Sequence, residues 1–145
     1  MAIRLPVMDL VEITDENWRA VADVAPRDDQ RRYVAALAAS YLLLSDRERV
    51  WTSLGISEGD QIVGHIMWGE EEGIAWIGGM VIDSEYQRRG FGRAAMERML
   101  HRLPHREVRL SVHPDNTAAI ALYDELGFKP TNMWDDDEQV YALRR

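Results

Sequence analysis

Cysteine is absent from this 145-residue sequence, which excludes disulfides and any reaction that uses a thiol side chain. Long apolar runs are also absent, since none approaches the roughly 20 residues that a membrane-spanning helix needs. The opening segment, MAIRLPVMDL, has no basic region followed by an apolar stretch and a cleavage site, so it does not resemble a signal peptide. We therefore expect a cytoplasmic protein with no membrane partner, and the lack of cysteine is compatible with a reducing compartment.

Positive charge is scarce in this sequence. The 17 Lys and Arg residues are outnumbered by 25 Asp and Glu residues, and the formal net charge is −8 at pH 7. A general nucleic-acid binder needs a basic face, because neutralisation of phosphates supplies most of its affinity, so nucleic acid is not an expected partner. The acids gather at residues 70–72 and 135–138. Such clusters are either solvated loops or attractors of a cationic substrate, and both interpretations stay open.

The sequence has no internal repeat, low-complexity tract or linker rich in proline and glycine. Apolar residues make up 46% and charged residues 29%, which is the balance of an ordinary globular domain. We therefore expect a single domain over residues 1–145, large enough to bury a proper core.

The spacing of apolar residues predicts the order of the secondary-structure elements. Strand-like segments are found over residues 3–13, 50–59, 60–69, 73–83, 107–113, 128–134 and 138–145. Helical spacing begins at a capping threonine, Thr14, and recurs over 28–44, after Gly92 and over 116–126. This order predicts an α/β (α+β) fold in which a mixed, mostly antiparallel sheet of six to seven strands carries helices on both faces.

A glycine-rich loop stands immediately before one of the expected helices. The segment from Gly90 to Ala95 fits the dinucleotide fingerprint G-x-G-x-x-A, but three apparent antiparallel strands precede it, which disfavours a nicotinamide site. Glycines let a backbone approach a ligand closely, and the N-terminus of a helix presents free N–H groups to an anion. Nearby arginines add charge-assisted hydrogen bonds. The loop is therefore either a pyrophosphate cradle of another kind or a plain turn with solvent-facing arginines.

Two longer segments, GGMVIDSEYQRRGFG and LSVHPDNTAAIALYDELGFKP, together resemble the GNAT family of acetyl-coenzyme A-dependent N-acetyltransferases. The family loop pattern Q/R-x-x-G-x-G/A is matched by residues 87–92, and the pattern N-x-x-A-x-x-L-Y-x-x-x-G-F by residues 116–128. The resemblance implies a GNAT fold with a splayed central pair of parallel strands. It also implies acetyl-coenzyme A as co-substrate, with no metal.

The resemblance assigns most of the expected site to the coenzyme. Backbone N–H groups from Arg88 to Arg93 are expected to hold its pyrophosphate, and the strand before the loop, which carries a bulge in this family, to hold its pantetheine arm. The Val81 N–H is our candidate for polarising the thioester carbonyl. The full set of expected coenzyme contacts is Met80, Val81, Ile82, Gln87, Arg88, Arg89, Gly90, Phe91, Gly92, Arg93, Asn116 and Tyr123.

The resemblance also implies a general acid, Tyr123, which protonates the departing thiolate; its alternative role is that of a packing aromatic. The sequence departs from the family at the general base, because polyamine acetyltransferases of this family often carry an acid where Gly78 and Gly79 stand here. We take Glu72, with its neighbours at 70 and 71, as a substitute to be tested. His65, on an apolar strand, is expected in the core or the cleft, and the four histidines have no metal-binding spacing.

The acceptor is the least determined part of the prediction. The segment ITDENWRAVADV and the residues that follow it resemble the N-terminal helices of bacterial diamine and spermine/spermidine acetyltransferases. The resemblance implies that the substrate is a primary amine, in particular a polyamine or another small cation. A protein N-terminus, a lysine or an antibiotic amine is the alternative acceptor, and an acyl-coenzyme A-binding module without catalysis is a third hypothesis. Many relatives form homodimers, and Trp134 is either such a contact, part of the core or part of the cleft lining.

Overall fold

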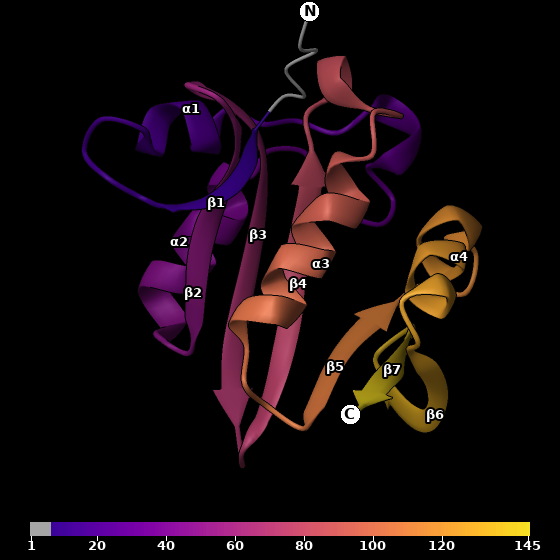
Figure 1. Ribbon diagram of the computed structural model, residues 1–145. Helices are drawn as coiled ribbons and strands as arrows, with labels where there is room; N and C mark the ends of the chain where they lie inside the picture. Colours follow the sequence, from indigo (N-terminus) through magenta and orange to yellow (C-terminus); the bar gives the residue numbers. More distant parts are fainter. Residues whose placement is uncertain (1–6) are drawn as a thin grey trace, which may run out of the picture.

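The computed structural model describes residues 7–145 (Figure 1), and the part of the expected first strand before Val7 lies outside them. Seven strands form one sheet in the order β1-β2-β3-β4-β5-β7-β6, and every neighbouring pair is antiparallel except β4 with β5. The strands are β1 Met8–Glu12, β2 Trp51–Glu58, β3 Gln61–Glu71, β4 Ile74–Ile82, β5 Glu107–Val112, β6 Lys129–Asp135 and β7 Glu138–Arg144. The mixed, mostly antiparallel sheet predicted from the sequence is confirmed.

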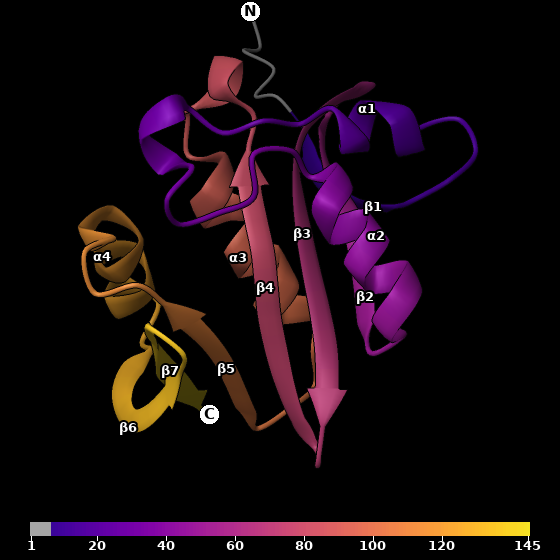
Figure 2. The ribbon, with the colours of Figure 1, turned by 180° about the vertical axis from the view of Figure 1, so that it is seen from behind.

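Helices cover both faces of this sheet. The α-helices are α1 Trp18–Ala22, α2 Ala39–Glu48, α3 Phe91–Arg102 and α4 Thr117–Glu125, with two short 3₁₀-helices, η1 Asp28–Gln30 and η2 Ser84–Tyr86. Helix α3 lies in front of the sheet in Figure 1, whereas α1 and α2 lie in front when the molecule is seen from behind in Figure 2. The prediction of helices on both faces is therefore confirmed as well.

The main hydrophobic core lies between the sheet and α3. Phe91, Ala95, Met96 and Met99 are buried at the four-residue spacing of one helix face, and they pack on buried residues of the strands and on Phe128. A smaller cluster on the other face joins Val24, Ala38 and Val81. Because β4 is packed from both sides, its residues are held firmly in place.

The N-terminal helices differ from the sequence prediction. Helix α1 begins at Trp18 with Asn17 as its N-cap residue. Thr14 caps the turn that precedes this helix, since its Oγ1 accepts hydrogen bonds from the N–H groups of Glu16 and Asn17, both at 3.2 Å. The prediction of a single helix over residues 28–44 is wrong. Only η1 and the first part of α2 form there, and a non-helical stretch separates them. In that stretch the Ala38 N–H donates to Val24 O at 2.9 Å and the Ala35 N–H donates to the Tyr41 hydroxyl at 2.9 Å. These partners replace the helical hydrogen bonds of the segment.

The central parallel pair is splayed, as the family resemblance implied. Strands β4 and β5 pair only at Ala75 with Val108 and at Trp76 with Arg109, and beyond these residues they diverge (Figure 2). Strand β4 also carries a bulge, because the register with β3 shifts between His65 and Met67 and leaves one extra residue on β4. Gly79, in this bulge, has a φ of +57°, which favours glycine. The edge of β4 after Trp76 thus faces a gap instead of a partner strand.

Two features bear on the expected partners. Within residues 7–145, no helix is long and apolar enough to cross a membrane. Trp134, on the edge strand β6, is 53% exposed, so it does not belong to the core. A homodimer that uses Trp134 stays a prediction.

Candidate active site

The gap between β4 and β5 holds two adjoining cavities. The larger has a volume of about 550 Å³ and the smaller about 370 Å³. Five residues line both, so the two form one continuous cleft; they are Tyr33, Val34, Met80, Asn116 and Tyr123. The cleft lies where the splayed strands expose a backbone edge, which is the place that the sequence resemblance implied for the coenzyme.

The smaller cavity is bounded by the glycine loop. Arg88, Gly90 and Gly92 line it, and left-handed conformations at Arg88 (φ +62°) and Gly90 (φ +81°) turn the chain into α3. The first hydrogen bond of the helix runs from the Ala94 N–H to Gly90 O at 3.0 Å. Within residues 7–145, the N–H groups of residues 88–93 find no acceptor. Free N–H groups at the start of a helix attract an anion, and these residues therefore fit a diphosphate.

The side chains of the loop have separate tasks. Gln87 Nε2 donates to Ile82 O and to Gln30 Oε1, at 2.5 and 3.1 Å, and so ties the loop to the end of β4 and to η1. Phe91 is buried in the core, which leaves only its backbone for a ligand. Arg89 stacks over the Tyr86 ring at 5.4 Å.

Arg88 and Arg93 are both among the expected coenzyme contacts, and the structure places their side chains apart. Arg88 lines the smaller cavity. Arg93 instead forms ion pairs with Glu97 and Glu125 on the outside of the molecule. A third arginine, Arg27, also lines the smaller cavity. It was missed by the sequence analysis, because it precedes η1 at a distance from every motif.

The direction of the β4 backbone groups corrects one expectation. The Asp83 N–H donates to Val63 O at 2.8 Å, which places it on the side of β3. Backbone N–H groups alternate in direction along a strand, and Val81 pairs with His65, so the Val81 N–H also faces β3. The N–H groups of Met80 and Ile82 take the opposite direction, toward the open edge. Val81 is therefore not the donor that faces a thioester, and Met80, which lines both cavities, is better placed.

His65 lies beneath the bulge and is fully buried. Its Nδ1 is 2.6 Å from Gly79 O and its Nε2 is 2.9 Å from Ser53 Oγ, and its ring stacks on Tyr41 at 5.4 Å. Burial lowers the pKa of His65 to about 4, although the bond to Gly79 acts in the opposite direction. The ring is thus neutral at physiological pH with both nitrogens occupied, as expected of a core histidine.

Tyr123 projects from α4 toward the junction of the two cavities. Its ring packs edge-on against Phe128, with centroids 6.0 Å apart. Burial raises the pKa of Tyr123 to about 12, and the charge of Glu138 acts in the same direction. Asn116 caps α4, because its Oδ1 accepts the Ala119 N–H at 3.4 Å, and it also lines both cavities.

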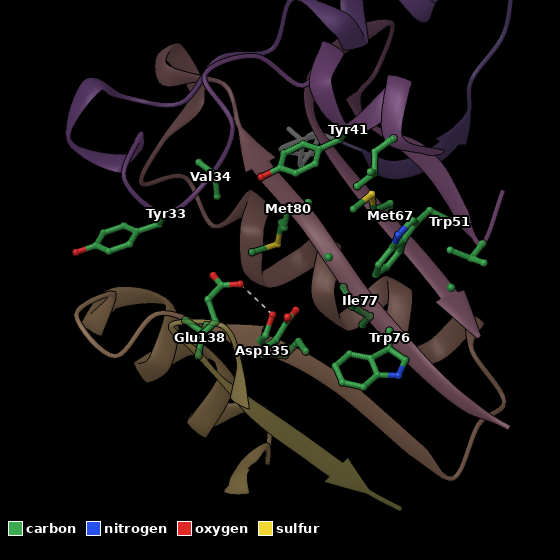
Figure 3. A pocket seen from close by; sticks show the side chains of 18 of the residues that line it. Tyr33, Val34, Tyr41, Trp51, Met67, Trp76, Ile77, Met80, Asp135 and Glu138 are labelled. Carbon is green, nitrogen blue, oxygen red and sulfur yellow. Dashed lines mark hydrogen bonds between the residues drawn. The ribbon is translucent and has the colours of Figure 1, made fainter. Parts of the chain in front are cut away.

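The larger cavity has an acidic wall. Four carboxylates from two hairpins line it, namely Glu70, Glu71, Asp135 and Glu138. None of the described residues that line this cavity is a lysine or an arginine. Aromatic side chains complete the lining, namely Tyr33, Tyr41, Trp51 and Trp76. Figure 3 shows Asp135 and Glu138 on one side of the cavity, with Tyr41, Met67 and Trp51 on the other. Carboxylates and aromatic rings together suit a cationic ligand.

The structure does not bring Glu72 to this cavity. Glu72 lies in the turn between β3 and β4 with a left-handed φ of +53°, it is exposed, and it is not among the lining residues. Glu70 lines the cavity but is bound to His105. His113, at the end of β5, faces Asp115 and Asp137. The acids at 135–138 are visible as a cluster in the sequence, but nothing in the sequence places Glu138 in the same cavity as Tyr123.

The fold and the cleft have the form of an N-acetyltransferase. The family model described as "Acetyltransferase (GNAT) family" matches residues 7–128, and the chain belongs to this family of enzymes.

Two curated relatives differ in what they acetylate. The chain is 44% identical over 76 residues to the [ribosomal protein bS18]-alanine N-acetyltransferase of Escherichia coli K12; this match covers 44% of the chain and spans about half of the relative (51%). It is 24% identical over 136 residues to the spermine/spermidine N(1)-acetyltransferase of Bacillus subtilis strain 168, a match that covers 84% of the chain and 88% of the relative. The higher identity is thus confined to a shorter segment.

The fold is shared with a solved structure. Spermidine N-acetyltransferase from Vibrio cholerae, in complex with CoA and spermine, superposes with a TM-score of 0.72 at 16% identity and covers 93% of this chain and 92% of its own. At this identity the likeness concerns the fold alone.

Proposed function

We propose that this enzyme transfers an acetyl group from acetyl-coenzyme A to a primary amine of a small polycation, with polyamines as the preferred class. The observation that carries the proposal is the acidic wall of the larger cavity, which has four carboxylates and, among the described lining residues, neither lysine nor arginine. A polyamine carries several ammonium groups at neutral pH, and such a wall raises its local concentration.

The smaller cavity is the proposed site of acetyl-coenzyme A. The unpaired N–H groups of residues 88–93 bind its diphosphate, and Arg88 and Arg27 supply positive charge beside them. The free N–H groups of Met80 and Ile82 bind the pantetheine arm along the open edge of β4. This arrangement directs the thioester toward the junction of the two cavities, where Tyr123 lies.

The proposed chemistry is direct attack of the amine on the thioester carbonyl. The Met80 N–H stabilises the negative charge that develops on the carbonyl oxygen. Tyr123 gives its proton to the departing thiolate. With a pKa of about 12, its phenol is fully protonated at neutral pH, so the acid is always in the required form.

A second candidate acceptor is the N-terminal alanine of a protein. The 44% identity to an alanine N-acetyltransferase over 76 residues favours it. A peptide N-terminus is also a cationic amine, and the acidic wall attracts it too. The two candidates differ in the spacing of their charges. A polyamine has a second ammonium group, which can pair with a second carboxylate of the acidic wall.

A panel of acceptors tests the proposal. Release of coenzyme A is measured with spermidine, spermine, propane-1,3-diamine, a peptide that begins with Ala-Arg, and an aminoglycoside, each at several concentrations. We expect the highest kcat/KM for one of the polyamines. Turnover of the peptide or the aminoglycoside beside inactive polyamines contradicts the proposed acceptor, and binding of acetyl-coenzyme A without turnover of any amine contradicts catalysis.

A further inference from the structure

Glu138 is a carboxylate that lines the same cavity as Tyr123, and its charge acts on the Tyr123 phenol. It opens β7 after a tight turn in which Asp136 has a φ of +56°, and it lines the larger cavity. Its side chain is half-buried and points into the cavity in Figure 3. Ser111 Oγ, on β5, donates a hydrogen bond to Glu138 Oε1 at 3.1 Å. One carboxylate oxygen is thus fixed by the neighbouring strand, while the other has no partner within residues 7–145.

Glu138 also lies within electrostatic reach of the phenols of the cavity. Burial is the main cause of the raised pKa of both Tyr123 and Tyr41, and the negative charge of Glu138 acts in the same direction on each. Tyr123 lines the same cavity from α4. A carboxylate and a phenol therefore face the place where the amine must meet the thioester.

We propose that Glu138 is the general base of the reaction, held in position by Ser111, and that it accepts the proton of the incoming ammonium ion. The proposal rests on the acetyl transfer proposed above. An amine is protonated at neutral pH and has no lone pair for attack until it loses one proton.

The protons balance in this scheme. The ammonium ion gives one proton to Glu138, and the neutral nitrogen forms its bond to the carbonyl carbon. As the carbon–sulfur bond breaks, the thiolate takes the proton of Tyr123, and the tyrosinate recovers a proton from the nitrogen that is becoming an amide. Glu138 then releases its proton to solvent through the open cavity. The products are the acetylated amine, coenzyme A and one proton.

The surroundings of Glu138 raise its pKa, which suits a general base. Burial raises its pKa, the hydrogen bond from Ser111 acts against this, and the nearby charges of Asp135 and Asp137 raise it further, whereas His113 lowers it. A carboxylate with a raised pKa binds a proton more strongly and is a better base than an exposed one.

The other candidates in the cleft are less suitable. Glu72 is exposed outside the cavity, and Glu70 is bound to His105. His65 has both ring nitrogens occupied within the core. Asp135 lines the cavity beside Glu138 but is exposed and has no hydrogen bond among the described residues to fix it. Asp135 is therefore a matched control, because it contributes the same charge to the cavity but is not held by a hydrogen bond as Glu138 is.

The experiment compares Glu138→Gln with Asp135→Asn. Each variant removes one negative charge from the same cavity, but only the first removes the proposed base. We expect Glu138→Gln to lower kcat for spermidine by about 10²-fold or more, with the calorimetric Kd of acetyl-coenzyme A unchanged. We expect Asp135→Asn, which removes a charge of the acidic wall but not the proposed base, to raise KM and to lower kcat far less than Glu138→Gln does. Equal effects of the two variants on KM, with kcat preserved in both, overturn the proposal.

A second measurement reports on the proton itself. Propane-1,3-diamine is compared with 2,2-difluoropropane-1,3-diamine, whose fluorines lower the pKa of both amines and make deprotonation easier. If Glu138 is the base, the loss of kcat in Glu138→Gln is at least about tenfold smaller for the fluorinated diamine. The reason is that an amine of lower pKa loses its proton more readily without a base. A loss of the same size for both diamines overturns the proposal.

Ser111→Ala tests the positioning. It removes the hydrogen bond to Glu138 but keeps the carboxylate, so we expect an intermediate loss of kcat and a shift of the acidic limb of the pH–kcat profile to higher pH. The direction follows because that bond favours the ionised form. An unshifted limb contradicts the role of Ser111. Absence of turnover in the wild-type enzyme overturns the proposed function, whereas full kcat in Glu138→Gln beside an active wild type overturns this inference alone.

Discussion

His65 Nδ1 donates a hydrogen bond to Gly79 O at 2.6 Å, and this bond joins two neighbouring strands at the bulge of β4. A carbonyl only accepts, so Nδ1 must carry the proton and Nε2 must be the acceptor for Ser53 Oγ at 2.9 Å. Ser45 Oγ, 2.6 Å from Ser53 Oγ, then donates to it. The carbonyl thus fixes the tautomer of His65 and makes Ser53 the donor to Nε2, and the network satisfies the extra backbone group that the bulge creates.

This network makes stability sensitive to acid. The pKa of His65 is lowered from 6.5 to about 4 in the folded protein, so the fold prefers the neutral ring. Its contribution is complete above pH 6.5 and is lost as the pH falls toward 4, a difference of about 3 kcal/mol in the free energy of unfolding. Urea unfolding at several pH values between 7 and 4 measures it. Because other groups also titrate there, the quantity to compare is the difference between wild type and His65→Gln, and a difference that does not change with pH contradicts the prediction.

Ser53→Ala tests the same network without changing a charge. It leaves the buried Nε2 of His65 without a donor, which costs about 1–3 kcal/mol of stability. Chemical denaturation at pH 7 measures the loss. Thr52→Ala, in which an exposed neighbour on the same strand is changed, is the matched control and should stay within about 0.5 kcal/mol of wild type. Similar stability of the two variants would mean that the Ser53 hydrogen bond contributes little.

Tyr123→Phe removes the proposed acid while keeping the ring that packs on Phe128. We expect kcat to fall by about 10²-fold and the Kd of acetyl-coenzyme A to change little, because only the proton is lost. The high pKa of Tyr123 also means that activity should show no alkaline loss from this group below about pH 10.

Tyr141→Phe is the control for Tyr123→Phe, since Tyr141 is buried on β7 and does not line either cavity. It should remain close to wild type in kcat. Wild-type kcat in Tyr123→Phe would rule out the acid role, and stopped-assay rates over pH 6–10 would reveal any alkaline limb.

Gly92 tests the coenzyme cradle. An added Cβ would lie 3.7 Å from Met80 Cε and 3.9 Å from Ile82 Cγ1, which are ordinary contacts, so Gly92→Ala should fold normally. A larger side chain at this position extends into the smaller cavity. We expect Gly92→Leu to raise the Kd of acetyl-coenzyme A by more than about tenfold while its thermal unfolding midpoint stays near that of Gly92→Ala. Unchanged affinity in a folded Gly92→Leu protein would place the diphosphate elsewhere.

The acidic wall predicts a dependence on salt. The KM for spermidine should rise with ionic strength, because added salt screens the attraction between the carboxylates and the ammonium groups. The double variant Glu71→Gln/Asp135→Asn should have a higher KM at low salt and a weaker salt dependence. Asp60→Asn removes an exposed charge in the distant turn between β2 and β3 and serves as control. A salt dependence that is identical in the double variant and the control would show that the wall does not attract the substrate.

Most of the sheet was predictable because its signal is local. The apolar or alternating segments at 50–59, 60–69 and 73–83 match β2, β3 and β4 to within two residues at each end, because turn residues separate them along the chain. The region of 28–44 was not predictable in this way. Tyr33 and Tyr41 have helical spacing, but Tyr33 OH donates to Asp115 O at 3.2 Å and lines the cleft instead. Partners far along the chain decided its conformation.

The sequence by itself determined the glycine loop, because the residues from Gln87 to Gly92 and the helix start that follows them are consecutive. A local pattern of this kind can be recognised without knowledge of the fold. Only the tertiary structure decided which groups meet in the cleft. The register of β5 with β7 brings Glu138 to the cavity that Tyr123 also lines, and the extra residue of the bulge sets which N–H groups of β4 face the open edge. A shift of one residue in a strand reverses the side to which each later residue of that strand points. The local pattern of apolar residues does not reveal such a shift.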